Sequence, residues 1–140
     1  MKILCLSRAP LDYKGGIPAY CLNLYSNKNF DVTNYSYDLS KKLKNVNVRI
    51  IRNIKEKVYP SQLVFGTIAF SIQYFKSILK NSCKYDVVHV QHPDPFSAIS
   101  VIFAKILNPK IKIIVTWHAD VYLSYFFIAP FLLIIDISLF

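Results

Sequence analysis

Acidic side chains are scarce in this chain of 140 residues, which has 8 Asp and Glu together and a single glutamate, Glu56. Most glycoside hydrolases place two carboxylates on either side of the bond that they cleave, and no close acidic pair is present here. Ser7 and Ser97 lack the Gly-x-Ser-x-Gly turn of the α/β-hydrolases, so a serine hydrolase is unsupported as well. The chain therefore offers no residue set for these hydrolytic mechanisms.

Glycine and cysteine are also rare, with 3 residues of each. The glycines form neither Gly-x-Gly-x-x-Gly nor Gly-Lys-Ser/Thr, which excludes a dinucleotide fingerprint and a Walker loop. Cys5, Cys21 and Cys83 are widely spaced without a Cys-x-x-Cys, which argues against a disulfide framework and a zinc ribbon. We expect three reduced thiols in a cytosolic protein. The apolar run at the N-terminus is too short for a signal peptide, whose apolar region spans about 7–15 residues.

The charge that is present is mainly positive, with 17 Lys and Arg and a formal net charge of +9. This balance predicts an anionic partner. Arginine, the residue suited to reading bases, accounts for few of the 17, so nucleic acid is disfavoured. Seven basic residues fall within 41–57, which is either a solvated face or a patch that faces acidic membrane lipids: Lys41, Lys42, Lys44, Arg49, Arg52, Lys55 and Lys57.

The last 20 residues, 121–140, are almost uniformly apolar. Their length would suffice for a membrane span, which needs about 20 apolar residues. Pro130 and Asp136 interrupt the run, and a helix packed against a sheet would have the same composition. Both interpretations stay open, with the packed helix favoured.

Strand and helix patterns alternate along the chain, which predicts one α/β domain, a Rossmann-like parallel sheet with helices on both faces. We expect strands at 2–7, 30–37, 46–51, 86–91 and 111–116. Helices are expected at 18–27, at 61–81, from 94 to about 107 and from 122 onward. Asp94 and Pro95 have the residue types of an N-cap and a first-turn proline.

Polar residues follow the apolar strands at the points where each leaves the sheet, which is where open α/β sheets bind ligands. His118 comes just after the strand at 111–116, and Asp120 could orient its ring or cap the next helix. Gly15 and Gly16 follow the first strand and precede a helix, an arrangement suited to a phosphate contact. His92 ends its strand and could line the crevice, whereas His89 is expected to be buried. Residues three apart on a strand face opposite sides, so these two histidines should not share a metal.

Three runs together resemble the N-terminal domain of GT-B glycosyltransferases, and more narrowly the GT4-like retaining group. They are Gly15-Gly-Ile-Pro-Ala19, Tyr85-Asp-Val-Val-His-Val-Gln-His-Pro93 with Asp94-Pro95-Phe96, and Val115-Thr-Trp-His-Ala-Asp-Val121. The resemblance extends from about Met1 to Asp120, and the Thr-Trp-His-Ala-Asp run is its most specific part.

The resemblance implies transfer of a sugar from a nucleotide-sugar, such as a UDP- or GDP-sugar, to a lipid, lipopolysaccharide or saccharide acceptor. It places Gly15 and Gly16 near the donor diphosphate and His118 at the transferred sugar, with no metal or other cofactor. Retention in this group is attributed to front-side attack with the leaving phosphate as base. We expect a cytoplasmic protein, peripheral on the inner face of the cell membrane.

The chain also departs from the family, because residues 1–140 would hold only an incomplete acceptor-side domain and no nucleotide-binding C-terminal domain. We therefore expect an N-terminal fragment that is inactive alone, or one half of a split enzyme completed by a separate donor-domain polypeptide. The alternatives are a non-enzymatic remnant, a small membrane protein anchored by residues 121–140, and another Rossmann-like domain such as a response regulator. The last lacks its expected acidic cluster after the first strand.

Overall fold

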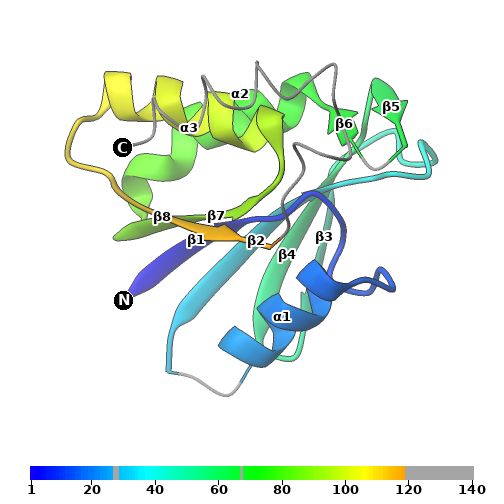
Figure 1. Ribbon diagram of the computed structural model, residues 1–140, viewed down its shortest axis with the longest axis horizontal. Coiled ribbons are helices and arrows are strands. Elements are labelled where there is room, and N and C mark those ends of the chain that lie inside the picture. Colours follow the sequence, from blue (N-terminus) through cyan, green and yellow to red (C-terminus); the bar gives the residue numbers. More distant parts are fainter. Residues whose placement is uncertain (27–28, 67, 119–140) are drawn as a thin grey trace.

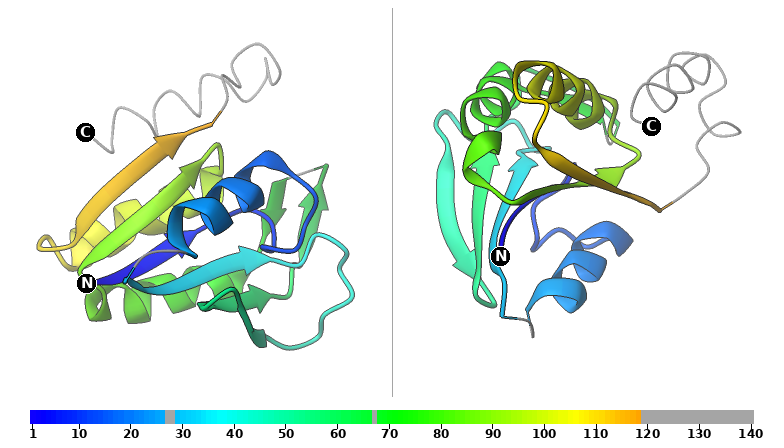
Figure 2. Two further views of the ribbon diagram at one scale, coloured as in Figure 1. Left: turned by 90° about the horizontal axis from the view of Figure 1, so that it is seen from below. Right: turned by 90° about the vertical axis from the view of Figure 1, so that its left-hand side faces the viewer.

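The computed structural model describes residues 1–26, 29–66 and 68–118. A central sheet has helix α1 on one face and helices α2 and α3 on the other (Figures 1 and 2). The elements in chain order are β1 (Lys2–Leu6), α1 (Gly16–Tyr25), β2 (Asp31–Tyr37), β3 (Asn47–Ile51), β4 (Ile54–Tyr59), β5 (Leu63–Phe65), β6 (Ile68–Phe70), α2 (Ile72–Asn81), the 3₁₀ turn η1 (Ser82–Lys84), β7 (Val87–His92), α3 (Pro95–Leu107) and β8 (Lys112–Trp117). The predicted α/β, Rossmann-like class is confirmed.

The sheet has 6 strands in the order β3-β4-β2-β1-β7-β8. Among the described strands, five are parallel, namely β4, β2, β1, β7 and β8. The edge strand β3 runs antiparallel and pairs with β4. From β1 the chain first adds strands on one side and then returns to add β7 and β8 on the other. The order therefore reverses between β1 and β7, and in open α/β sheets ligands bind at such a reversal, beyond the carboxyl ends of the strands.

The central strand β1 is buried on both faces because its apolar run has no polar interruption. Leu4 and Leu6 belong to the core beneath α2 and α3, while Ile3 and Cys5 belong to the core beneath α1. This alternation follows from the two-residue period of a strand. It gives the domain two apolar cores, one on each face of the sheet.

Several predicted elements are confirmed, including α3, which begins at Pro95 after the N-cap Asp94. The helix predicted for 61–81 is wrong in its first half. Strands β5 and β6 form an antiparallel hairpin there, and α2 begins only after Ser71, whose hydroxyl accepts from the Tyr74 amide at 3.2 Å. Gly66, with φ +59, lies in the turn of that hairpin, a conformation that glycine adopts without steric cost.

Strand β4 was not predicted from the sequence, and the strand expected at 46–51 in a parallel sheet is the antiparallel β3. The charged residues 55–57 concealed β4, because a central strand is expected to be apolar. The helix expected from residue 122 and the apolar run 121–140 lie outside the described residues. Within the described ranges, no helix is long and apolar enough to cross a membrane.

Candidate functional site

The candidate site lies at the carboxyl edge of the sheet, beyond the ends of β1, β7 and β8. His118 directly follows β8, and Gly15 and Gly16 lie at the start of α1. Helix α1 reaches His118 through Tyr20, whose ring meets the imidazole edge to face with 4.8 Å between centroids. The structure thus brings the glycine-led helix and the histidine to one edge of the sheet.

His118 is half-buried and is held by two contacts from β7. Its backbone amide donates to the carbonyl of His92 at 3.1 Å, which continues the ladder one residue past the end of β8. Its Nε2 lies 2.6 Å from Oε1 of Gln91, a fully buried side chain. An amide oxygen only accepts hydrogen bonds, so Nε2 is the donor.

The surroundings of His118 favour the neutral form of its ring. Burial lowers its pKa below the usual 6.5, and the positive charge of Arg8 lowers it further. A neutral imidazole carries one N–H donor and one lone pair. Because the N–H is donated to Gln91, the lone pair on Nδ1 is left to accept from a ligand hydroxyl.

The first turn of α1 has backbone amides that no carbonyl of the helix itself can accept, as at any helix N-terminus. Gly15 is the N-cap and supplies no side-chain hydrogen bond, and the first turn contains no acidic residue. The amides and the helix dipole there favour an anion. A side chain at Gly16 would meet nothing within 4 Å in the described part of the chain, so a ligand has room to approach the backbone.

A buried polar network holds the connection between β1 and α1. Glu56, on β4, accepts from the Leu11 amide at 2.8 Å, from Asn34 at 3.0 Å and from Ser36 at 3.1 Å. Arg49 of β3 binds the other carboxylate oxygen of Glu56 at 2.8 Å and bridges to Asp12 at 2.8 Å and 2.5 Å. The only glutamate of the chain therefore fixes the segment that leads to Gly15 and Gly16.

The two strand histidines differ from each other in position. His89 is buried as expected, between the Tyr25 hydroxyl at Nδ1 and Thr116 Oγ1, which lies 2.6 Å from Nε2. His92 is fully buried and stacks on Trp117, with 4.2 Å between centroids and 7° between planes. Residues next to one another on a strand point to opposite faces, so the His92 ring lies on the side away from Gln91 and His118. Its backbone carbonyl accepts from the His118 amide. That its side chain lines the crevice stays a prediction.

Asp120, the expected orienting residue of His118, lies outside the described residues. The contacts that the structure does show come from Gln91 and Tyr20, with Arg8 near enough to affect the ring electrostatically. None of these three residues was predicted from the sequence, although Gln91 stands within the run from Tyr85 to Pro93 that carries the family resemblance. Within the described ranges no three His, Cys, Asp or Glu residues come together as metal ligands.

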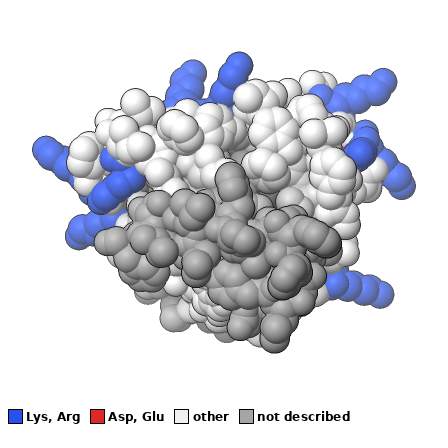
Figure 3. Space-filling model, turned by 45° about the horizontal axis from the view of Figure 1, so that its top comes forward, with Lys and Arg blue, Asp and Glu red and all other residues white. Residues whose placement is uncertain are grey.

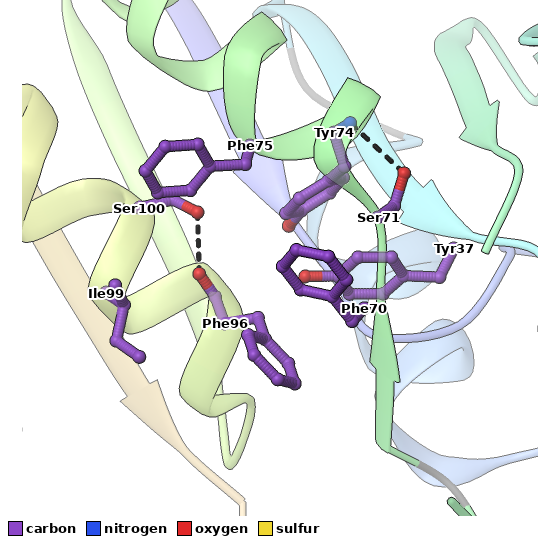
Figure 4. A pocket seen from close by; sticks show the side chains of 8 residues that line it. All are labelled: Tyr37, Phe70, Ser71, Tyr74, Phe75, Phe96, Ile99 and Ser100. Carbon is purple, nitrogen blue, oxygen red and sulfur yellow. Dashed lines mark hydrogen bonds between the residues drawn. The ribbon is translucent and has the colours of Figure 1, made fainter. Parts of the chain in front are cut away.

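An apolar pocket of about 150 Å³ lies on the other face of the sheet, between the end of β2 and the beginnings of α2 and α3 (Figure 4). Its walls are largely aromatic, and the buried Tyr37 hydroxyl has no hydrogen-bond partner among the described residues. The lining residues are Tyr37, Phe70, Ser71, Tyr74, Phe75, Phe96, Ile99 and Ser100. The pocket could hold a small apolar group that carries one polar atom.

A doubly wound α/β domain with a histidine and a glycine-led helix at its switch point is a common ligand-binding architecture. The sequence model of Glycosyltransferase Family 4 matches residues 15–135, which cover the α1 start, β7 and the His118 run. The chain belongs to this family. No curated protein and no solved structure matched it significantly.

Proposed function

We propose that this domain is the acceptor-side half of a retaining, nucleotide-sugar-dependent glycosyltransferase. Membership of Glycosyltransferase Family 4 supports sugar transfer in general. The observation that carries the finer proposal is the contact between Tyr20 of α1 and His118, because it joins an anion-binding helix start to a neutral imidazole.

The proposed roles follow from the chemistry of each group. The amides at Gly15 and Gly16 bind the diphosphate of a UDP- or GDP-sugar, and His118 binds a hydroxyl of the transferred sugar. A second domain, in the same or a separate polypeptide, holds most of the nucleotide across the edge of the sheet. The acceptor oxygen bonds to the anomeric carbon, the bond from that carbon to the phosphate oxygen breaks, and the acceptor proton passes to the leaving phosphate.

The acceptor is proposed to be lipid-linked or a saccharide. The apolar pocket between β2, α2 and α3 lies beside the carboxyl ends of the strands and supports an acceptor with an apolar portion. Its volume is close to that of a cavity that accommodates benzene, so it would take a short part of such a chain.

The test is an NMR titration of the ¹⁵N-labelled chain with UDP-glucose and GDP-mannose at millimolar concentration. We expect shifts at the amides of Gly15, Gly16, Tyr20 and His118, and much smaller shifts with the free sugar. The proposal is wrong if saturating nucleotide-sugar leaves these amides unmoved.

A sugar-transfer assay distinguishes the proposed half-enzyme from a non-enzymatic remnant. We expect the isolated chain to turn over little or nothing, and to gain activity when mixed with a family donor domain. A remnant would bind neither the nucleotide-sugar nor such a domain. A rate from the isolated chain in the ordinary range of about 1–1,000 per second would contradict the half-enzyme assignment.

We also propose peripheral binding at the cytoplasmic face of an anionic membrane, through α2 and α3 rather than through the basic segment 41–57. In that segment Arg49 is already paired with Glu56 and Asp12.

Helix α3 instead exposes Phe103, Ile106 and Leu107, of which the last two are 68% and 71% exposed. Exposed lysines flank this row, namely Lys76, Lys80 and Lys105. Figure 3 shows basic side chains around this side of the molecule and no acidic ones among the coloured atoms.

Vesicle sedimentation tests this surface. We expect binding to phosphatidylglycerol vesicles that weakens with salt and is absent with phosphatidylcholine, because each basic residue near such a surface contributes up to about 1 kcal/mol. Lys76→Glu with Lys80→Glu should abolish it, whereas Lys41→Glu with Lys42→Glu makes the same charge change on the other segment and should not. If the Lys41 and Lys42 variant loses binding and the Lys76 and Lys80 variant keeps it, the membrane-binding surface is the segment 41–57.

A further inference from the structure

Gln91 is a fully buried amide that lies between two histidines. Its Oε1 is 2.6 Å from Nε2 of His118, and its Nε2 is 3.2 Å from both ring nitrogens of His89. The same Nε2 lies 3.6 Å from the Cys5 sulfur. Every polar atom of this side chain therefore has a partner in the core beneath α1.

The surroundings of His89 set the orientation of this amide. Burial, and then the charge of His118, lower the pKa of His89 to about 4, so its ring is neutral. Its nitrogens already face the hydroxyls of Tyr25 and Thr116. The side-chain amide of Gln91 can have two orientations. With its NH₂ group toward His89, it donates toward the ring and the Cys5 sulfur. With its oxygen there, it would have to compete with Tyr25 and Thr116 for the N–H of His89. The oxygen is left to face His118.

We propose that Gln91 is the positioning residue of His118, fixing the ring proton on Nε2 and leaving the Nδ1 lone pair to accept from a ligand hydroxyl. The hydrogen bond to Gln91 is made by Nε2, and no hydrogen bond to Nδ1 is seen among the described residues. A lone pair attracts a hydroxyl donor and repels a phosphate oxygen, so the ring selects the sugar rather than the diphosphate. This selection rests on the proposed function, but the position of the proton does not.

The experiment reads the ring directly, by long-range ¹H–¹⁵N spectra of the imidazoles in the labelled chain at pH 7.5. We expect His118 to carry its proton on Nε2, visible as a resonance protected from exchange with water. Gln91→Met, which keeps the length of the side chain but removes the acceptor, should abolish that protection. Gln91→Glu puts a carboxylate beside the ring and should raise the His118 pKa by more than about one unit.

Thr116→Val is the matched control, because it removes a hydroxyl partner from His89 and leaves the Gln91 oxygen in place. It should keep the protected Nε2 proton of His118. A wild-type ring protonated on Nδ1, or a Gln91→Met variant that retains the protected Nε2 proton, would overturn the proposal. If Gln91→Met does not fold, the wild-type spectrum and Gln91→Glu still decide.

Titration with UDP-glucose separates this inference from the proposed function. If the ring carries its proton on Nε2 but no nucleotide-sugar binds, the role of Gln91 stands and sugar transfer fails. If nucleotide-sugar binds equally to wild type and Gln91→Met, the selection attributed to Gln91 is refuted while the proposed function survives.

Discussion

At the scale of single residues, the site depends on which face of a strand each side chain occupies. Gln91 and His92 are neighbours on β7, yet one contacts the ring of His118 and the other stacks on Trp117. Period-two alternation makes this difference obligatory once the sheet has two covered faces. The chemistry of His92 makes it the candidate in the sequence, whereas the geometry places the neighbouring Gln91 amide against His118.

Gly16 offers the sharpest residue-scale test, because its Cβ position is open and its backbone is helical. Gly16→Leu should leave the melting temperature unchanged or raise it, since leucine favours a helix by up to about 1 kcal/mol over glycine. It should nevertheless abolish the nucleotide-sugar shifts by blocking the approach to the backbone amides.

Asn23→Leu is the matched control for this variant, because Asn23 is an exposed position on the same helix. It should leave ligand binding intact. Circular dichroism melts and the NMR titration measure both variants, and undiminished binding by Gly16→Leu would remove α1 from the site.

At the scale of secondary-structure elements, β3 and β4 were the hardest to predict. Glu56 and its flanking lysines give β4 the composition of an exposed segment, although Glu56 is fully buried. Its burial is possible only because Arg49, Asn34, Ser36 and the Leu11 amide come from other parts of the chain. No local pattern shows those contacts.

This network predicts that replacing Arg49 lowers the free energy of unfolding more than replacing Asp12, its exposed partner. Arg49→Met leaves Glu56 buried without its counter-ion and should lower the free energy of unfolding by about 3–5 kcal/mol. Asp12→Asn removes the partner whose side chain is 59% exposed and should cost less than about 1 kcal/mol. Urea unfolding measures both, and equal losses would show that Glu56 does not depend on its cation.

At the scale of the whole molecule, two buried groups give stability opposite dependences on pH. His89 has its pKa lowered by burial to about 4, against 6.5 unfolded, so stability is lost as pH falls between these values. Asp94 has its pKa raised by burial to about 6, against 3.8 unfolded, so stability is lost as pH rises between these values. Each effect is about 3 kcal/mol, and the two nearly cancel between pH 4 and 6.

We therefore expect Asp94 to offset most of the stability that His89 loses in the wild-type chain between pH 6 and 4. His118, whose pKa is also lowered, adds a loss in the same direction as His89. Asp94→Asn keeps an N-cap residue for α3 but removes one titration, so it should lose about 3 kcal/mol on acidification over that range. Urea titrations at several pH values test this. Asp12 and Asp38, whose pKa values are lowered, act mainly below this range. Parallel pH profiles for variant and wild type would contradict the assignment.

Part of this protein follows from its sequence alone. The apolar strands at the centre of the sheet, the Asp94–Pro95 helix start and the location of Gly15, Gly16 and His118 after their strands are local patterns, each set by a few adjacent residues. Such patterns are readable because period and capping depend on backbone geometry nearby in the chain.

Only the tertiary structure decided the rest. Gln91 and His118 are 27 positions apart, as are Asn34 and Ser7, and these contacts arise from strand order and register. The antiparallel pairing of β3, the burial of Glu56 and the stacking of His92 have the same origin. Each of these features is stabilised by contacts with residues from distant segments of the chain. No local stretch of sequence contains both partners, so no local pattern can predict the contact.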